Sequence, residues 1–97
     1  MAIYDPPHPG EFIRELYIEP SNLSIRKVAE ALDVSSSTLN RLLNGQSAIS
    51  SEMALRLSIT LGRSPESWLA MQDQYSLWQV RQKINLGVVR KIEVSAA

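Results

Sequence analysis

Apolar residues recur at spacings of three and four between residues 23 and 45, in two short runs that a tight turn separates. The apolar positions of the two runs are Val28, Ala29, Leu32, Leu39, Leu42 and Leu43. Spacings of three and four place side chains along one side of an α-helix. The pattern therefore predicts two short amphipathic helices in tandem, each with one buried face.

Capping residues mark where these two helices begin and end. Ser24 and Ser35 precede the two apolar runs, and a serine hydroxyl at an N-cap accepts a hydrogen bond from a free amide of the first turn. Asp33 and Val34 supply the turn between the helices, and Gly45 follows the second helix as a left-handed C-cap.

Ala29 is the residue expected where the two helices cross. Helices that cross at a steep angle must approach closely, and a larger side chain at the crossing would hold them apart. The two helices over residues 24–44 therefore predict a helix-turn-helix, the motif that places its second helix in the major groove of DNA.

The outward face of the second helix is polar, and Arg41 carries its only charge. A helix that reads bases needs short hydrogen-bonding side chains near its N-terminus and a guanidinium that reaches guanine or phosphate. We predict base contacts by Ser36, Ser37, Thr38, Asn40 and Arg41. We predict phosphate contacts by Ser24, Arg26, Asn44 and Gln46. The alternative is an ordinary solvated face, but such a face usually carries Glu–Lys pairs, which this one lacks.

Proline, glycine and serine positions delimit three further helices. They are predicted from Gly10 to about Tyr17, from about Ser51 to Leu61, and from the Ser64 cap toward Ile84. The predicted fold class is therefore all-α, with five helices, an extended fifth helix and a short C-terminal tail. Residues 1–84 are expected to form one domain, and residues 85–97 the tail.

Two aromatic residues lie late in the long last helix, at Tyr75 and Trp78. Large amphipathic rings in such a position are typical of the centre of a protein interface. We therefore predict that Tyr75 and Trp78 form the contact of a homodimer, whereas Trp68 closes the core.

The tail mixes valine and isoleucine with basic residues after Gly87. Ile92 and Val94 alternate with charged neighbours, which is the pattern of a short strand that pairs with its twin or with another protein. A frayed terminus explains the same residues equally well.

Composition narrows the class of protein. A chain of 97 residues with 44% hydrophobic content fits one domain with a single core. It has no cysteine, which suits a reducing compartment, and neither a membrane span nor a signal peptide is recognisable. We therefore expect a cytoplasmic protein.

The net charge of the chain is zero, although many DNA-binding domains are basic. Residues 1–21 carry net −3, residues 22–50 net +1 and residues 51–97 net +2. Few phosphate contacts per subunit are therefore expected, which makes a dimer more necessary and the binding sensitive to salt.

His8, Glu11 and Glu15 lie close together in the chain and could in principle bind a metal. Acidic residues in a first turn also complement the helix dipole, and no cysteine, second histidine or activated nucleophile accompanies these residues. We therefore expect no enzyme, no metal and no cofactor.

The helix-turn-helix residues resemble the lambda-repressor-like, or Xre-like, family in order and spacing. The matching residues are Leu23-Ser24, Val28-Ala29, Val34-Ser35, Thr38-Leu39-Asn40-Arg41 and Asn44-Gly45. One position departs, because Ile25 stands where many members carry a glutamine that anchors a phosphate. Arg26 or Lys27 is expected to replace that anchor.

The flanks of the motif narrow the resemblance to HigA-type antitoxins of bacterial toxin–antitoxin modules. The flanking segments read HPGEFIRELYIEP and GQSAISSEMALRLSITLGRSPESWLAMQDQYSLW, so the resemblance covers residues 8–78. It implies a protein that binds a HigB-type toxin, a ribosome-dependent endoribonuclease, and that represses its own operon as a dimer.

Two other functions fit the same residues. The first is a helix-turn-helix repressor without a toxin partner. The second is a module that masks a toxin without binding DNA, which the zero net charge and Ile25 favour slightly. For a DNA-binding dimer, we expect an inverted-repeat operator whose half-sites lie roughly 34 Å apart.

Overall fold

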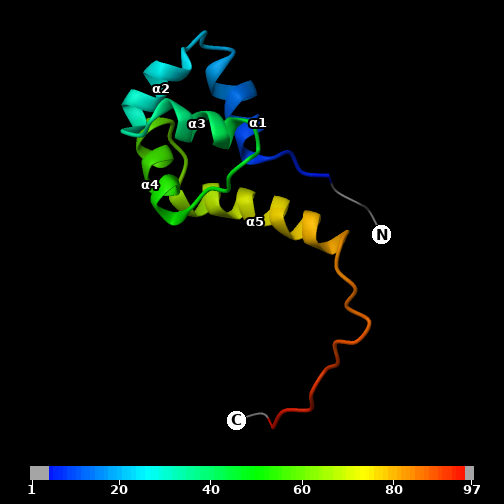
Figure 1. Ribbon diagram of the computed structural model, residues 1–97. Helices are drawn as coiled ribbons and strands as arrows, with labels where there is room; N and C mark the ends of the chain where they lie inside the picture. The colour runs from blue at the N-terminus through cyan, green and yellow to red at the C-terminus, as the bar shows by residue number, and fades with distance from the viewer. Residues whose placement is uncertain (1–4, 96–97) are drawn as a thin grey trace.

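The computed structural model describes residues 5–95 as a cluster of short helices with one long helix beneath them (Figure 1). The helices are α1 (Pro9–Ile13), α2 (Ile25–Leu32), α3 (Ser36–Leu43), α4 (Ser51–Thr60) and α5 (Pro65–Arg81), and one turn of π-helix, η1 (Arg14–Ile18), directly follows α1. The described part of the chain contains no strand. The all-α prediction with five helices is therefore confirmed.

The first predicted helix is a composite of two helical forms. An α-helical turn begins one residue earlier than predicted, at Pro9, and continues as η1. The Glu19 amide donates to the Arg14 carbonyl at 2.9 Å, five residues back, which is the π-helical bond. Sequence periodicity does not distinguish such a turn from an α-helix because it changes the spacing by a single residue.

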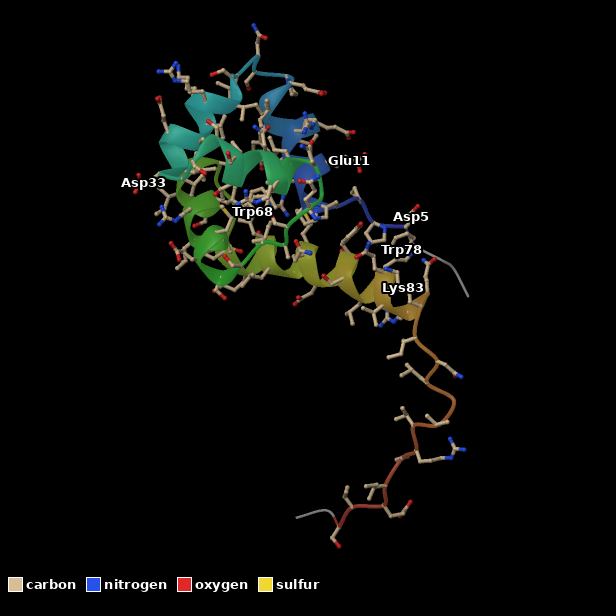
Figure 2. All side chains as sticks on the ribbon, viewed as in Figure 1. Asp5, Glu11, Asp33, Trp68, Trp78 and Lys83 are labelled. Carbon is tan, nitrogen blue, oxygen red and sulfur yellow. The ribbon has the colours of Figure 1, made fainter. Side chains whose placement is uncertain are left out.

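Trp68 of α5 lies at the centre of the core (Figure 2). It is fully buried, and the rings of Phe12 and Tyr17 each lie 6.0 Å from its own. Its indole nitrogen donates to the Gly62 carbonyl at 2.9 Å, so no polar atom of the ring is left unpaired by burial. The remaining fully buried side chains include Ile13, Leu39, Leu42 and Leu57.

Helix α1 packs on α3 through Gly10. A Cβ atom at Gly10 would lie 1.9 Å from the Leu42 carbonyl oxygen and 2.8 Å from the Leu43 Cα atom. The backbones of α1 and α3 can therefore approach only because this position lacks a side chain. This contact fixes α1 against the second helix of the helix-turn-helix.

The last helix ends at Arg81, three residues before the predicted end. A hydrogen-bonded turn continues to Ile84, whose amide donates to the Val80 carbonyl at 3.0 Å. Every residue from Arg81 to Ser95 is exposed, so no packing offsets the entropy cost of a longer helix. Residues 82–95 contain neither helix nor strand, and a strand that pairs with a second chain stays a prediction. Residues 96 and 97 of the predicted tail lie outside the described part.

Candidate nucleic-acid interface

Helices α2 and α3 begin at the two predicted serine caps. The Ser24 hydroxyl accepts a hydrogen bond from the Lys27 amide, and the Ser35 hydroxyl accepts one from the Thr38 amide, each at 3.0 Å. Both caps have extended backbone conformation, as an N-cap requires. The two helices therefore begin where their sequence predicts.

The turn between α2 and α3 is closed by the backbone. Asp33 adopts a left-handed conformation with φ 59°, and the Val34 amide donates to the Ala29 carbonyl at 3.0 Å. Ala29 is only 1% exposed, which agrees with its predicted place in the contact between the helices. This geometry fixes the angle at which α3 leaves α2.

Arg56 of α4 forms hydrogen bonds with the C-terminal end of α2. Arg56 donates to the carbonyls of Leu32 and Asp33 at 2.9 and 3.1 Å, and Glu52 holds its guanidinium at 2.7 Å. These carbonyls have no partner within α2, as at every helix end. The turn of the helix-turn-helix is therefore braced from a third helix, an interaction that the sequence analysis did not predict.

Most of the predicted base-contacting residues lie on an open face of α3. Ser36, Ser37, Asn40 and Arg41 are exposed, and none of them donates or accepts a side-chain hydrogen bond in the described chain. Thr38 differs, since it is half-buried and its hydroxyl accepts from the Ser35 hydroxyl at 2.9 Å. Four of the five side chains are therefore free to reach a ligand, and the base contacts themselves stay a prediction.

Several predicted phosphate-contacting residues already have partners in the chain. The Arg26 guanidinium lies 3.5 Å from the Glu30 carboxylate, an exposed pair that solvent screens. The Asn44 amide oxygen accepts a hydrogen bond from Arg14 at 3.0 Å. Gln46 is exposed.

The contact with Asn44 brings Arg14 to the C-terminal end of α3, from a segment far away in the sequence. Arg14 is therefore a further cation beside the predicted interface. Nothing local to residues 9–18 indicates that η1 packs near this end of α3, so the sequence does not predict Arg14 at this place.

The loop after α3 is held by one buried amide. Gln72 of α5 is 7% exposed, its oxygen accepts from the Ile49 amide at 2.9 Å, and its nitrogen donates to the Ser76 hydroxyl at 3.1 Å. A buried amide hydrogen without an acceptor would be costly. Gln72 thus fixes the path of the chain that leads out of the predicted DNA-reading helix.

His8 joins three parts of the molecule. Its Nδ1 atom accepts a hydrogen bond from the Gly10 amide at 2.9 Å, so it caps α1. Its ring meets the Tyr75 ring edge to face at 4.9 Å, and lies beside Gly45 at the end of α3. Burial lowers the pKa of His8, although a hydrogen bond to the Ser47 backbone and the charge of Glu11 act in the opposite direction. His8 is therefore a capping residue with a structural role.

The predicted dimer residues contact their own chain. Tyr75 lies against His8, accepts a hydrogen bond from Gln79 at 3.0 Å, and has its ring 6.1 Å from that of Trp78. Both rings are half-buried. The Trp78 indole nitrogen is buried and has no hydrogen-bond partner among the described residues. A role of these residues in a dimer stays a prediction.

Residues 5–95 contain no group of three or more His, Cys, Asp or Glu side chains placed to hold a metal ion. Within the same residues, no helix combines the length and the apolar character needed to cross a membrane.

A family model described as helix-turn-helix matches residues 13–68 of this chain. The matched segment contains α2, α3 and α4 and the braced turn between α2 and α3. The chain belongs to the helix-turn-helix family.

Relatives indicate which branch of the family this chain resembles. The helix-turn-helix transcriptional regulator YddM of Escherichia coli is 35% identical over 92 residues, which is 95% of this chain and 97% of the relative. Antitoxin HigA-1 of Vibrio cholerae is 32% identical over 74 residues, 76% of this chain and 70% of the relative. The solved structure of antitoxin GraA in complex with its operator is 34% identical, with a TM-score of 0.86 and coverage of 97% and 98% of the two chains.

Proposed function

We propose that this protein is an antitoxin that binds and neutralises a HigB-type endoribonuclease toxin, and that it represses its own operon as a sequence-specific DNA-binding homodimer in the cytoplasm. The observation that carries the DNA-binding part is the open polar face of α3, held at the end of a braced helix-turn-helix. The likeness to an antitoxin solved with its operator supports the same assignment.

The size and chemistry of α3 suit the major groove. An α-helix with its side chains is about 10–12 Å across, which fits the ~12 Å width of the groove. Ser36 and Ser37 lie in the first turn, where short side chains reach base edges. Arg41 follows one turn later, within reach of a guanine or a phosphate.

A gel-shift titration tests this assignment. The probe is the DNA directly upstream of the protein's own reading frame, with random DNA as competitor at two salt concentrations. Arg41→Ala should cost about 1–3 kcal/mol on the specific probe if Arg41 reads a base. The matched control is Arg63→Ala, which removes an exposed cation in the connection between α4 and α5. Equal weakening on specific and random DNA would assign Arg41 to a phosphate instead.

We infer no catalytic activity of the chain itself, because His8 serves as a cap and Glu11 complements the first turn of α1.

The toxin part of the proposal rests on the relatives named as antitoxins. The product of the neighbouring reading frame, if it is the toxin, should stop growth when it is expressed alone. Co-expression with this protein should restore growth, and the two proteins should copurify as a complex. A chain that binds its operator but no such product would be a repressor without a toxin partner.

A chain that binds the neighbouring product but not its operator would be a module that masks a toxin without reading DNA. The zero net charge of the chain is the observation behind this second candidate. The two candidates separate cleanly, because the gel shift measures DNA binding and the copurification measures toxin binding.

We further infer that the protein binds DNA as a homodimer on an inverted repeat. A single α3 offers one free arginine and three short polar side chains, which is little for specific recognition. Two copies set roughly 34 Å apart double these contacts and match one turn of DNA. Footprinting should therefore protect two half-sites about one helical turn apart.

A further inference from the structure

The outward side of α5 carries an uncovered apolar stripe. Leu77, Val80 and Ile84 are 52%, 51% and 50% exposed and follow each other at spacings of three and four. The Ile84 amide still bonds to the Val80 carbonyl, so Ile84 continues the stripe beyond the end of the helix. Tyr75 faces the opposite way, against His8. We call Leu77, Val80 and Ile84 the α5 stripe.

The chain beyond the stripe is apolar and uncovered as well. Its large apolar side chains are 55–80% exposed, and they are Leu86, Val88, Val89, Ile92 and Val94. Figure 1 shows this segment leaving the end of α5 and pointing away from the helices. We call residues 86–95 the arm. A run of exposed apolar side chains of this kind marks a protein interface.

Charge is divided between the arm region and the rest of the chain. Residues 81–97 contain four basic residues and one acidic residue, so their net charge is +3. Because the whole chain has zero net charge, residues 1–80 carry net −3. The arm itself contains Arg90, Lys91 and Glu93, so its net charge is +1, and this basic arm of one copy is complementary in sign to the acidic residues 1–80 of another copy.

We propose that the two copies of the dimer exchange arms, each arm lying along the α5 stripe of the other copy. This inference rests on the homodimer of the proposed function and adds its interface. The arm leaves the C-terminal end of its own α5 and points away from its own stripe. In a dimer with a two-fold axis, the α5 helix of the second copy runs in the opposite direction, so the arm of the first copy can run along the stripe of the second. Each arm thereby covers an apolar face that one chain leaves open.

Lengths along the arm and the stripe agree. From Asp73 to Ile84, the last part of α5 and the turn that follows it span about 16 Å, at ~1.5 Å per residue. An extended arm covers the same length in about five residues, at ~3.3 Å each. An arm that enters with Leu86 beside the partner's Ile84 therefore brings Lys91 to the partner's Asp73, which is exposed one turn before Leu77. Opposite charges meet at the far end of the apolar contact.

Self-association of the purified full chain, measured by sedimentation velocity over a range of concentrations, tests the exchange. Leu77→Ser and Val88→Ser should each raise the dimer dissociation constant by about tenfold or more. The matched control is Ile59→Ser, because Ile59 is an 86% exposed apolar residue on α4, outside the stripe and the arm. Circular dichroism checks that each variant keeps the helical content of the original protein, which the exposure of these positions predicts.

A charge exchange tests the register. Asp73→Lys and Lys91→Glu should each weaken the dimer, and the two changes combined in one chain should recover most of the loss. Glu66→Lys, the same charge change in the first turn of α5, should leave the constant unaltered. An unchanged constant for Val88→Ser would overturn the exchange and leave the arm to a toxin or to DNA. Absence of recovery in the double variant would overturn the pairing of Lys91 with Asp73. The measurement contains neither DNA nor toxin, so a failure of operator binding or of toxin binding would not alter it. An original chain that stays monomeric would overturn the homodimer and the exchange together.

Discussion

Gly10→Ala should destabilise the protein although it places a better helix former in a helix. Alanine in the interior of a helix is ordinarily favoured over glycine by about 1 kcal/mol. Here the added Cβ atom would lie 1.9 Å from the Leu42 carbonyl oxygen, whereas ordinary contact begins at 3.4 Å. The obstacle is backbone, which cannot rotate aside as a flexible side chain would.

The magnitude follows from the separation that the methyl group requires. Reaching ordinary contact needs α1 to move from α3 by about 1.5 Å, the difference between 3.4 and 1.9 Å. Such a shift would loosen the packing of the fully buried Ile13. Overpacking of a core costs about 1–3 kcal/mol, and backbone contact places Gly10→Ala at the upper end. After the ~1 kcal/mol helix preference for alanine is subtracted, we expect a net loss of roughly 2 kcal/mol, a large part of the ~5–10 kcal/mol typical of a domain of this size.

Urea denaturation followed by tryptophan fluorescence measures this loss, because Trp68 is buried in the same core. The matched control is Gly87→Ala in the exposed arm, where the nearest atom is the flexible amide oxygen of Asn85. The control should change the free energy of unfolding by less than about 0.5 kcal/mol. A Gly10→Ala protein as stable as the original would show that α1 and α3 do not make the described contact.

Three further predictions concern the supports of the helix-turn-helix. Gln72→Leu should lower the free energy of unfolding by about 1–3 kcal/mol, because the Ile49 amide loses its acceptor, and urea denaturation measures this. Burial lowers the pKa of His8 below its ordinary 6.5, so the folded protein favours the neutral ring. The free energy of unfolding is therefore highest above pH 6.5 and decreases as the pH falls below that value, because the unfolded chain then binds the proton more readily. His8→Asn keeps a capping side chain without titrating, so its unfolding free energy should depend less steeply on pH between 7 and 5. Arg56→Lys should lower the melting temperature and increase amide exchange at the end of α2. The reason is that a single ammonium group cannot make the hydrogen bonds of the guanidinium to two carbonyls and to Glu52. Unchanged amide exchange at the end of α2 would refute the bracing role of Arg56.

The fold was predictable where the cause of structure is local. Ser24 and Ser35 accept the hydrogen bonds that their positions predict, because a cap involves residues only three apart. The apolar stripes of α2 and α3 are buried for the same reason, since helical periodicity determines which side chains share a face. The end of α5 was overestimated because the pattern of residues 82–84 is helical, although nothing packs against them.

The interactions that support the candidate site depend on tertiary contacts and could not be predicted in this way. Gln72 and Arg56 lie 23 and 24 residues from the backbone groups Ile49 and Leu32 that they bind. A glutamine or an arginine on a helix resembles any solvated residue until its partner is known. Gly10 gave no signal either, because its function is to leave room for the backbone of Leu42, 32 residues away.

The loop from Gly45 to Ser50 is already ordered before any DNA arrives, because the buried Gln72 holds its backbone at Ile49. A segment that folds on binding typically costs about 2–5 kcal/mol in ordering and adds a large negative heat-capacity change. In this protein that ordering belongs to folding and not to association. Calorimetry of operator binding should therefore give a heat-capacity change that reflects only the surface buried between the folded protein and the DNA. Gln46 would contact the phosphate backbone without a preceding rearrangement of its loop.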